Sequence, residues 1–436
     1  MTVVQPGARV LVTGANGFIG GRIVAYLLGA GYRVLGAVRR PEPFLRRFPA
    51  AEAVAIDMNR DTTAESWLPR LDGVDAVVNC AGILQQSRGQ SIDAIHHRAP
   101  AALFDACLMA GVRRVIQISA ISADAAAGTD YALSKKAADD HLAGLDLDWV
   151  VLRPSLVYGS GSHGGTSLMR ALAALPFAVP LVGAGDQVFR PIHLDDLART
   201  VTTILARPDL SRAVIEPVGP ERLTLKQILL KLRAWLGLRP VPALPVPVPV
   251  VAAACKVGDW TGAGPMRTTS LKQILYGNDA PADPFVAAIG FTPRTMDAAL
   301  ASYPAQTQDR WHARLFFLRP ALRWLLALMW AVSGLLGLFL PAEITYPLAD
   351  FAGFSEPVLA ALVIGSSVVD LALAAWVVSN RRPGLACLVQ VAVIVAYTVG
   401  LTVGHPALWL DPFGSLLKNL PILAAVLVNA AIAEER

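Results

Sequence analysis

The chain has 436 residues, of which 54% are hydrophobic and 16% are charged. Because a typical soluble domain has about 25% charged residues, we expect part of this chain to lie outside water. The length exceeds one ordinary hydrophobic core, so two or more domains are expected. The small formal charge of +5 is scattered and does not favour nucleic-acid binding. The four cysteines lack metal-ligand spacing, so no metal site is predicted.

A glycine-rich turn follows the first predicted strand, at residues 10–12, and precedes a predicted helix at residues 22–28. Strand, glycine turn and helix in this order are typical of a dinucleotide-binding site. Small residues let backbone N–H groups approach a pyrophosphate, which then faces the N-terminus of the helix. The predicted cofactor-binding residues of this turn are Gly14, Asn16, Gly17, Phe18, Ile19 and Gly20.

The second predicted strand, residues 32–38, ends in Arg39 and Arg40. A site that prefers NAD usually has Asp or Glu about 20 residues after the glycines, to bind the ribose 2′-OH. Arg39 can instead bind a 2′-phosphate, so we predict a preference for NADP(H), with NAD(H) as the alternative. Arg22 and Arg40 are candidate helpers, and a solvated turn without a ligand is the competing interpretation.

Strands are further predicted at residues 51–56, 74–79 and 114–119, with a helix at residues 92–110 before the last of them. Strands that alternate with helices predict an α/β fold with a doubly wound parallel sheet, whose ligands lie at the carboxyl ends of the strands. Asp57 is expected to touch an adenine edge or to cap a turn. The cofactor residues predicted at these strand ends are Asp57, Met58, Ala81 and Gly82.

Tyr131 and Lys135 are four residues apart on a predicted helix, so their side chains share one face. The lysine ammonium is expected to lower the pKa of the tyrosine phenol toward the working range. Tyr131 is then the candidate acid/base for a carbonyl or alcohol oxygen while a nicotinamide carries hydride. Ser119, at a strand end, is the candidate that holds this oxygen, with Ser122 as its rival.

These motifs resemble the short-chain dehydrogenase/reductase superfamily in its extended or atypical branch, which is NAD-dependent epimerase/dehydratase-like. The resemblance covers residues 8–300 and rests on T-G-x-x-G-x-x-G, Y-x-x-x-K and the segments at 152–159 and 190–198. It implies a nicotinamide cofactor that Lys135 and Pro154 also contact. The stretch from Pro242 to Arg294 is similar to the nucleotide-binding accessory subunit of respiratory complex I. His96-His97 stand where the branch often has an Asn, which leaves catalytic turnover open.

Residues 240–250 are rich in proline and apolar residues. Three interpretations stay open: a polyproline spacer, a segment against lipid headgroups, and core packing. His193 has no partner at ligand spacing and is expected to be a structural histidine.

Four apolar runs, at residues 321–340, 358–378, 385–403 and 416–432, each approach the roughly 20 residues of a bilayer crossing. Arginines precede the first run and separate the second from the third, whereas the other two loops are acidic. By the positive-inside rule, both termini are expected in the cytoplasm of a multi-pass inner-membrane protein. The region resembles the DoxX-like four-helix membrane domain, on Trp330-x-x-Ser333-Gly334 and the layout of the runs.

Asp370 is the ionisable residue inside a predicted span. A functional role and a position at the cytoplasmic interface near Arg381 or Arg382 are both open, and the second is the simpler interpretation.

The sequence thus predicts a Rossmann domain with a small substrate lobe at residues 1–305, followed by a four-helix transmembrane bundle at residues 306–436. The expected partners are NAD(P)H, the lipid bilayer, and a hydrophobic substrate or membrane partner protein. The predicted function is oxidation, reduction or epimerisation of a membrane-associated substrate such as a quinone, lipid or lipid-linked sugar. The alternative is an NADPH-binding structural or sensing subunit without turnover.

Overall fold

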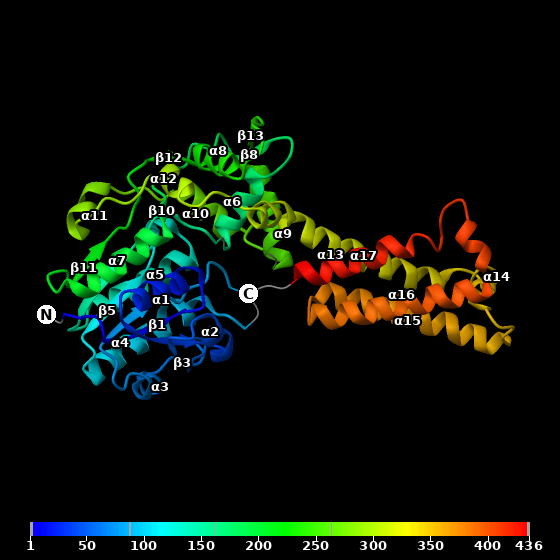
Figure 1. Ribbon diagram of the computed structural model, residues 1–436, viewed down its shortest axis with the longest axis horizontal. Helices are drawn as coiled ribbons and strands as arrows, with labels where there is room; N and C mark the ends of the chain where they lie inside the picture. The colour runs from blue at the N-terminus through cyan, green and yellow to red at the C-terminus, as the bar shows by residue number, and fades with distance from the viewer. Residues whose placement is uncertain (1–2, 87–88, 162, 263, 434–436) are drawn as a thin grey trace. The chain divides into compact units, whose positions relative to one another are not determined.

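The computed structural model describes residues 3–86, 89–161, 163–262 and 264–433 (Figure 1). The chain divides into two compact units, Met1–Ala313 and Arg314–Arg436.

The first unit is built on a seven-stranded sheet in the order β11-β6-β5-β4-β1-β2-β3, with every neighbouring pair parallel. This is the doubly wound α/β sheet that the sequence predicts. Its strands are β1 (Arg9–Thr13), β2 (Arg33–Val38), β3 (Glu52–Ala55), β4 (Ala76–Asn79), β5 (Arg114–Ile118), β6 (Asp148–Leu152) and β11 (Ala213–Ile215).

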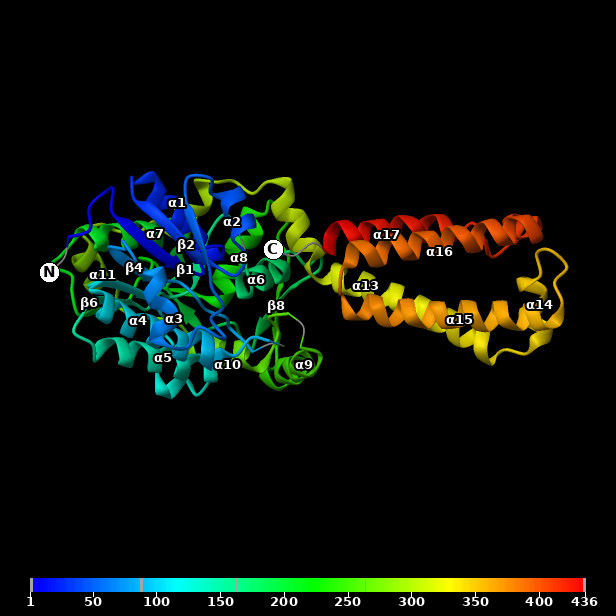
Figure 2. The same cartoon turned by 90° about the horizontal axis from the view of Figure 1, so that it is seen from below.

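Alternate residues of each strand pack against helices on opposite faces of the sheet. Val10 and Val12 of β1 lie in a core with α1 (Phe18–Gly29) and α7 (Leu194–Ala206), whereas Leu11 packs with α4 (Ala99–Ala110) and α5 (Asp130–Ala143). Figure 2 shows these two helical layers on either side of the sheet. Burial on both faces explains why the strands are almost continuously apolar. Short helical elements complete the layers: α2 (Pro41–Arg47), α3 (Ala64–Trp67), η1 (Leu68–Arg70), η2 (Ala94–Arg98), η3 (Ala125–Ala127) and α11 (Ala282–Ile289).

The lobe predicted to bind substrate, called the substrate lobe, has a core of its own, formed largely by α6 (Gly165–Ala173), α8 (Leu225–Trp235) and α12 (Met296–Ala301). The proline-rich stretch forms strand β13 (Ala243–Val246), which pairs in parallel with β8 (Val179–Val182), so the polyproline-spacer interpretation is wrong. Helices α9 (Val248–Thr261) and α10 (Thr268–Tyr276) follow it. The remaining strands are β7 (Val157–Tyr158), β9 (Val188–Phe189), β10 (Ile192–His193) and β12 (Leu223–Thr224).

The second unit is helical. Three of its helices are long and apolar enough to cross a membrane: α13 (Thr307–Phe339), α15 (Glu356–Ser379) and α16 (Pro383–Gly404). The fourth predicted span is α17 (Asn419–Ala433), an apolar helix of 15 residues in the part of the chain that is described. The sequence analysis did not predict α14 (Ala342–Ala349) or the short η4 (Pro406–Leu410).

The unit's core collects apolar residues from all four long helices, including Trp330, Leu373, Ile394 and Val426. Many large apolar side chains, among them Leu325 and Leu388, are exposed on its outside. An apolar exterior around a packed core is expected of helices in lipid.

Candidate functional site

The glycine turn has the geometry of a phosphate cradle. Gly14 adopts a φ of 60°, and a Cβ there would lie 2.9 Å from the carbonyl oxygen of Cys80. A Cβ on Gly20 would overlap the carbonyl of Gly14, so only glycine lets α1 pack this close to the turn. Helix α1 begins at Phe18, and its N-cap residue Gly17 supplies no capping side chain. The first N–H groups of α1 are therefore available to a pyrophosphate, and the residues present fit a dinucleotide.

A buried polar network fixes the neighbouring strand ends. The Thr13 hydroxyl donates to Asn79 and accepts from the backbone N–H groups of Cys80 and Ala81, at 3.1 and 3.3 Å. The Asn79 amide in turn donates to Gln117 at 2.6 Å. Strands β1, β4 and β5 are thus tied together next to Ala81.

The arginines predicted near the cofactor lie at two different places in the fold. Arg39 and Arg40 are exposed where β2 leads into α2. Arg22 donates instead to Asp195 at 2.6 Å, on the α7 side of α1, so its predicted role as a helper of Arg39 is wrong. Arg47, which the sequence analysis missed, brings its guanidinium to the glycine turn and donates to the Asn16 carbonyl at 3.4 Å.

Asp57 follows β3 and caps its own turn, which is one of its two predicted roles. Its carboxylate accepts from the backbone N–H of Asn59 at 3.0 Å and from the Asn59 amide at 3.2 Å. Met58 is buried in the core behind this turn. An adenine contact of Asp57 stays a prediction.

Helix α5 carries both Tyr131 and Lys135. Lys135 is buried, and its ammonium donates to the carbonyl oxygens of Ile118 at 2.9 Å and Ala81 at 3.4 Å. A Cβ on Gly82 would lie 3.2 Å from this ammonium, so Lys135 reaches the ends of β4 and β5. Burial lowers the pKa of Lys135 to about 8.

The pKa of Tyr131 shifts opposite to the prediction. Desolvation raises it to about 12, and the negative charge of Asp139 adds to the shift. The prediction that Lys135 lowers the pKa of this phenol is therefore wrong for the structure, because desolvation of the buried phenol determines the direction of the shift.

Ser119 is buried and held by a charged group. Its hydroxyl donates to Asp139 at 2.8 Å, and the same carboxylate oxygen accepts from Arg153 at 3.0 Å. Pro154, the residue after Arg153, accepts from the backbone N–H of Ile121 at 3.2 Å and so packs beside the end of β5. The sequence analysis missed Asp139, which lies one helical turn after Lys135.

His96 is a further residue, after Arg47 and Asp139, whose role the sequence did not reveal. It lies in the π-helical turn η2 and is fully buried, and π-helical turns are frequent at functional sites. Its Nε2 accepts from the backbone N–H of Ile83 at 2.8 Å, which leaves the proton on Nδ1 to donate to the Ser134 hydroxyl at 3.0 Å. The imidazole also packs edge-on against the Tyr131 ring, with the centroids 5.3 Å apart. Burial and the Lys135 charge lower the pKa of His96 to about 2, so the ring is neutral.

Helix α10 of the substrate lobe lies over the start of α5. Gln273 donates to Thr129, the N-cap residue of α5, at 2.8 Å, and Ser270 accepts from Gln85 at 2.7 Å. A cleft of about 390 Å³ opens between the end of α10, at Leu275 and Tyr276, and the segment after β5, at Ile121 and Asp124. This volume is in the range of small-molecule sites.

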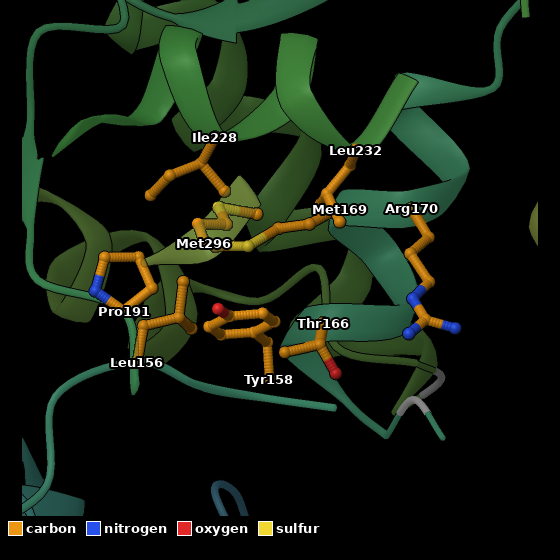
Figure 3. Close-up of a pocket in the computed structure, with 9 residues that line it drawn as sticks. All are labelled: Leu156, Tyr158, Thr166, Met169, Arg170, Pro191, Ile228, Leu232 and Met296. Atoms are coloured by element: carbon orange, nitrogen blue, oxygen red, sulfur yellow. The ribbon is translucent and has the colours of Figure 1, made fainter. Parts of the chain in front are cut away.

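A second cavity lies inside the substrate lobe, where Met169, Ile228, Leu232 and Met296 surround the ring of Tyr158 (Figure 3). Its volume of about 10 Å³ holds one water molecule at most, so we interpret it as a packing void. Among the residues that the structure describes, no group of three or more His, Cys, Asp or Glu side chains could hold a metal ion.

The comparisons with known proteins define the class of each unit. Residues 10–215 match the model of the NAD dependent epimerase/dehydratase family, and residues 327–427 match that of the DoxX-like family. The chain therefore fuses a nicotinamide-cofactor domain of the oxidoreductase and epimerase type to a membrane-associated DoxX-like domain.

Individual relatives cover mainly the first unit. Ceramide reductase of Caulobacter vibrioides is 26% identical over 256 residues, which are 58% of this chain and 78% of that protein. The mitochondrial NADH dehydrogenase (ubiquinone) 1 alpha subcomplex subunit 9 of Arabidopsis thaliana is 25% identical over 203 residues, 46% of this chain and 50% of that protein. The solved structure of MoeE5 in complex with UDP-glucose and NAD shares the fold, with a TM-score of 0.53 at 23% identity over 71% of this chain and all of that one.

Proposed function

We propose that the protein is a membrane-anchored, NADPH-dependent reductase of a carbonyl group on a membrane lipid or quinone. The observation that carries the proposal is the arrangement at the start of α5, where Tyr131, Lys135 and His96 meet beneath α10. The ceramide reductase relative supports reduction of a lipid, and the fusion to a DoxX-like unit supports a substrate that resides in the membrane.

The substrate lobe has a surface that suits such a substrate. Helix α9 packs on α10 and buries only Cys255, while Val250, Val257 and Trp260 project outward, the last with 88% of its surface exposed. An aromatic residue beside aliphatic ones on an exposed helix is typical of contact with lipid headgroups and upper acyl chains.

The nicotinamide supplies the hydride when the cofactor is bound. The glycine turn and Arg39 hold the nucleotide, with Arg39 selecting the 2′-phosphate by a charge-assisted contact. Tyr131 gives its phenol proton to the carbonyl oxygen of the substrate, and the buried Lys135 cation holds the ends of β4 and β5 beside the nucleotide. His96, with its proton on Nδ1, holds Ser134 and thereby orients the first turn of α5.

Replacement of Tyr131 by Phe tests the proposal. The variant should bind NADPH within about threefold of the unmodified protein by calorimetry, because the phenol oxygen contributes little to nucleotide binding. It should lower NADPH oxidation with ceramide-type ketones or quinones in vesicles by about 100-fold or more, the usual contribution of a general acid. Tyr32→Phe is the matched control, since its hydroxyl donates to the Val4 carbonyl at 3.0 Å outside the site. Activity that survives in Tyr131→Phe would refute the assignment.

The second candidate function is an NADPH-binding subunit without turnover. It is favoured by the engagement of Ser119 with Asp139, by the raised pKa of Tyr131, and by similarity to the complex I subunit. In that case, no carbonyl substrate would be consumed, and NADPH would raise the melting temperature of the intact protein equally in Tyr131→Phe.

A further inference from the structure

Asp370 lies inside the helical core of the second unit. It is 3% exposed and sits on α15, nine residues before the helix ends at Ser379. At 1.5 Å per residue, this places it about 13 Å from that end of a candidate membrane span. The interpretation that Asp370 faces the interface near Arg381 or Arg382 is therefore wrong.

Two neutral hydroxyl groups from other helices contact the carboxyl group. Ser333 of α13 donates to Oδ2 at 2.6 Å, and Tyr397 of α16 lies 2.9 Å from Oδ1. Close packing of α13 on α15 makes the first contact possible, because a Cβ on Gly334 would come 2.7 Å from the Ser367 carbonyl. Three helices thus converge on one carboxyl group.

Within the described residues, the helix segments that surround Asp370 carry no cationic side chain. Residues 324–339 of α13, all of α16 and residues 419–433 of α17 include no Asp, Glu, Lys, Arg or His. The titratable group that faces Asp370 is Tyr397, and Glu343 of the adjoining α14 is exposed. An ionised carboxylate without a cation inside a membrane costs at least about 2.5 kcal/mol.

The contacts of Tyr397 are compatible with a proton on the Asp370 carboxyl group. Its oxygen lies 2.9 Å from Asp370 Oδ1 and also 3.3 Å from the backbone carbonyl oxygen of Ser366. A phenol has one proton and can donate to only one of these oxygens. If the Asp370 carboxyl carries a proton on Oδ1, it donates to Tyr397, Tyr397 donates to Ser366, and Ser333 donates to Oδ2. Every polar contact is then satisfied.

We propose that Asp370 is an intramembrane proton-binding site, in which the acid form is held at neutral pH by Ser333, Tyr397 and the Ser366 carbonyl. This inference does not depend on the function of the first unit.

Infrared spectroscopy of the full-length protein in lipid vesicles tests the proposal. At neutral pH, the difference between the unmodified protein and Asp370→Asn should contain the carbonyl-stretch band of one protonated carboxylic acid. Glu343→Gln, which removes an exposed carboxylate, should leave this band unchanged. Ser333→Ala should move the band to higher frequency, because the carbonyl oxygen Oδ2 loses its hydrogen-bond donor.

A difference spectrum without a protonated-acid band would show that Asp370 is ionised and would overturn the proposal. If Asp370→Asn does not assemble, the protein that keeps the carboxyl group is labelled with [4-¹³C]aspartate, which identifies aspartic acid bands by their isotope shift. A labelled band that moves in Ser333→Ala then assigns the protonated acid to Asp370. An isotope-sensitive acid band that Ser333→Ala fails to move would belong to another aspartate and would equally overturn it.

Discussion

The neutral, buried His96 should make the stability of the first unit depend on pH. Its pKa in the folded chain is about 2, against 6.5 for an ordinary histidine. The unfolded chain therefore binds a proton at His96 that the folded chain does not, and acid favours unfolding. The contribution of His96 to the free energy of unfolding is complete above about pH 6.5. It is lost progressively as the pH falls toward the pKa of His96 in the folded chain.

The size of this effect follows from the pH range between the ordinary pKa of histidine, 6.5, and the pKa of His96 in the folded chain. Each pH unit below 6.5 costs about 1.36 kcal/mol, so His96 alone should lower the free energy of unfolding by about 2 kcal/mol between pH 6.5 and pH 5. His96→Asn should remove this part of the pH dependence. The variant should also lose about 1–3 kcal/mol at pH 7.5, because the shorter Asn side chain has no acceptor at the position of Nε2 and the Ile83 N–H loses its partner.

Pulse proteolysis in urea measures both effects on the full-length protein in lipid nanodiscs, from the fraction of the first unit that resists a brief exposure to protease. His97→Asn is the matched control, because this neighbouring ring is partly exposed and contacts Asp93 at 3.2 Å. His193, whose pKa burial lowers to about 4, keeps its own acid sensitivity in every variant. Equal pH slopes in the unmodified protein and in His96→Asn would refute the reasoning.

Three further outcomes are expected. By calorimetry, NADPH should bind at least about tenfold more tightly than NADH, a difference in binding free energy of about 1.4 kcal/mol. Arg39→Asp should narrow or reverse this difference. Equal affinities in the unmodified protein would contradict the role of Arg39. Lys135→Met should weaken NADPH binding, whereas Tyr131→Phe should not, because only Lys135→Met removes the buried cation at the strand ends. Unchanged NADPH affinity in Lys135→Met would show that Lys135 does not contact the nucleotide. Cysteines placed at Asp350 and Arg381 should be labelled from outside intact cells only at position 350; labelling at 381 would reverse the topology.

The sheet could be predicted from the sequence because each strand is a short apolar run that ends at small or polar residues. The predicted strand at residues 114–119 appears as β5, Arg114–Ile118, and the glycine turn lies between β1 and α1 as expected. These features depend on local patterns, which a single sequence contains.

The surroundings of the site could not be predicted because they depend on contacts between distant residues. Ser119 binds Asp139, 20 residues further on, and Thr129 binds Gln273, 144 residues away. Asp370 shows the same limitation in the membrane unit, since its partners Ser333 and Tyr397 are 37 and 27 residues distant. Proximity in sequence to Arg381 and Arg382 suggested a position at the cytoplasmic interface, but both arginines lie beyond the end of α15 at Ser379.

The contact between Ser119 and Asp139 bears on the choice between enzyme and subunit. A hydroxyl has a single proton, and that of Ser119 is donated to the Asp139 carboxylate, which Arg153 also binds. Ser119 can then accept a hydrogen bond but cannot donate one to a carbonyl oxygen. Of the two predicted donors, Tyr131 would act alone, so its loss should abolish reduction. Because Ser119 and Arg153 bind the same carboxylate oxygen, an amide oxygen at that position would still hold the Ser119 proton, so Asp139→Asn need not free it. Asp139→Ala removes the acceptor, and a gain of turnover in this variant would show that the network restrains the site.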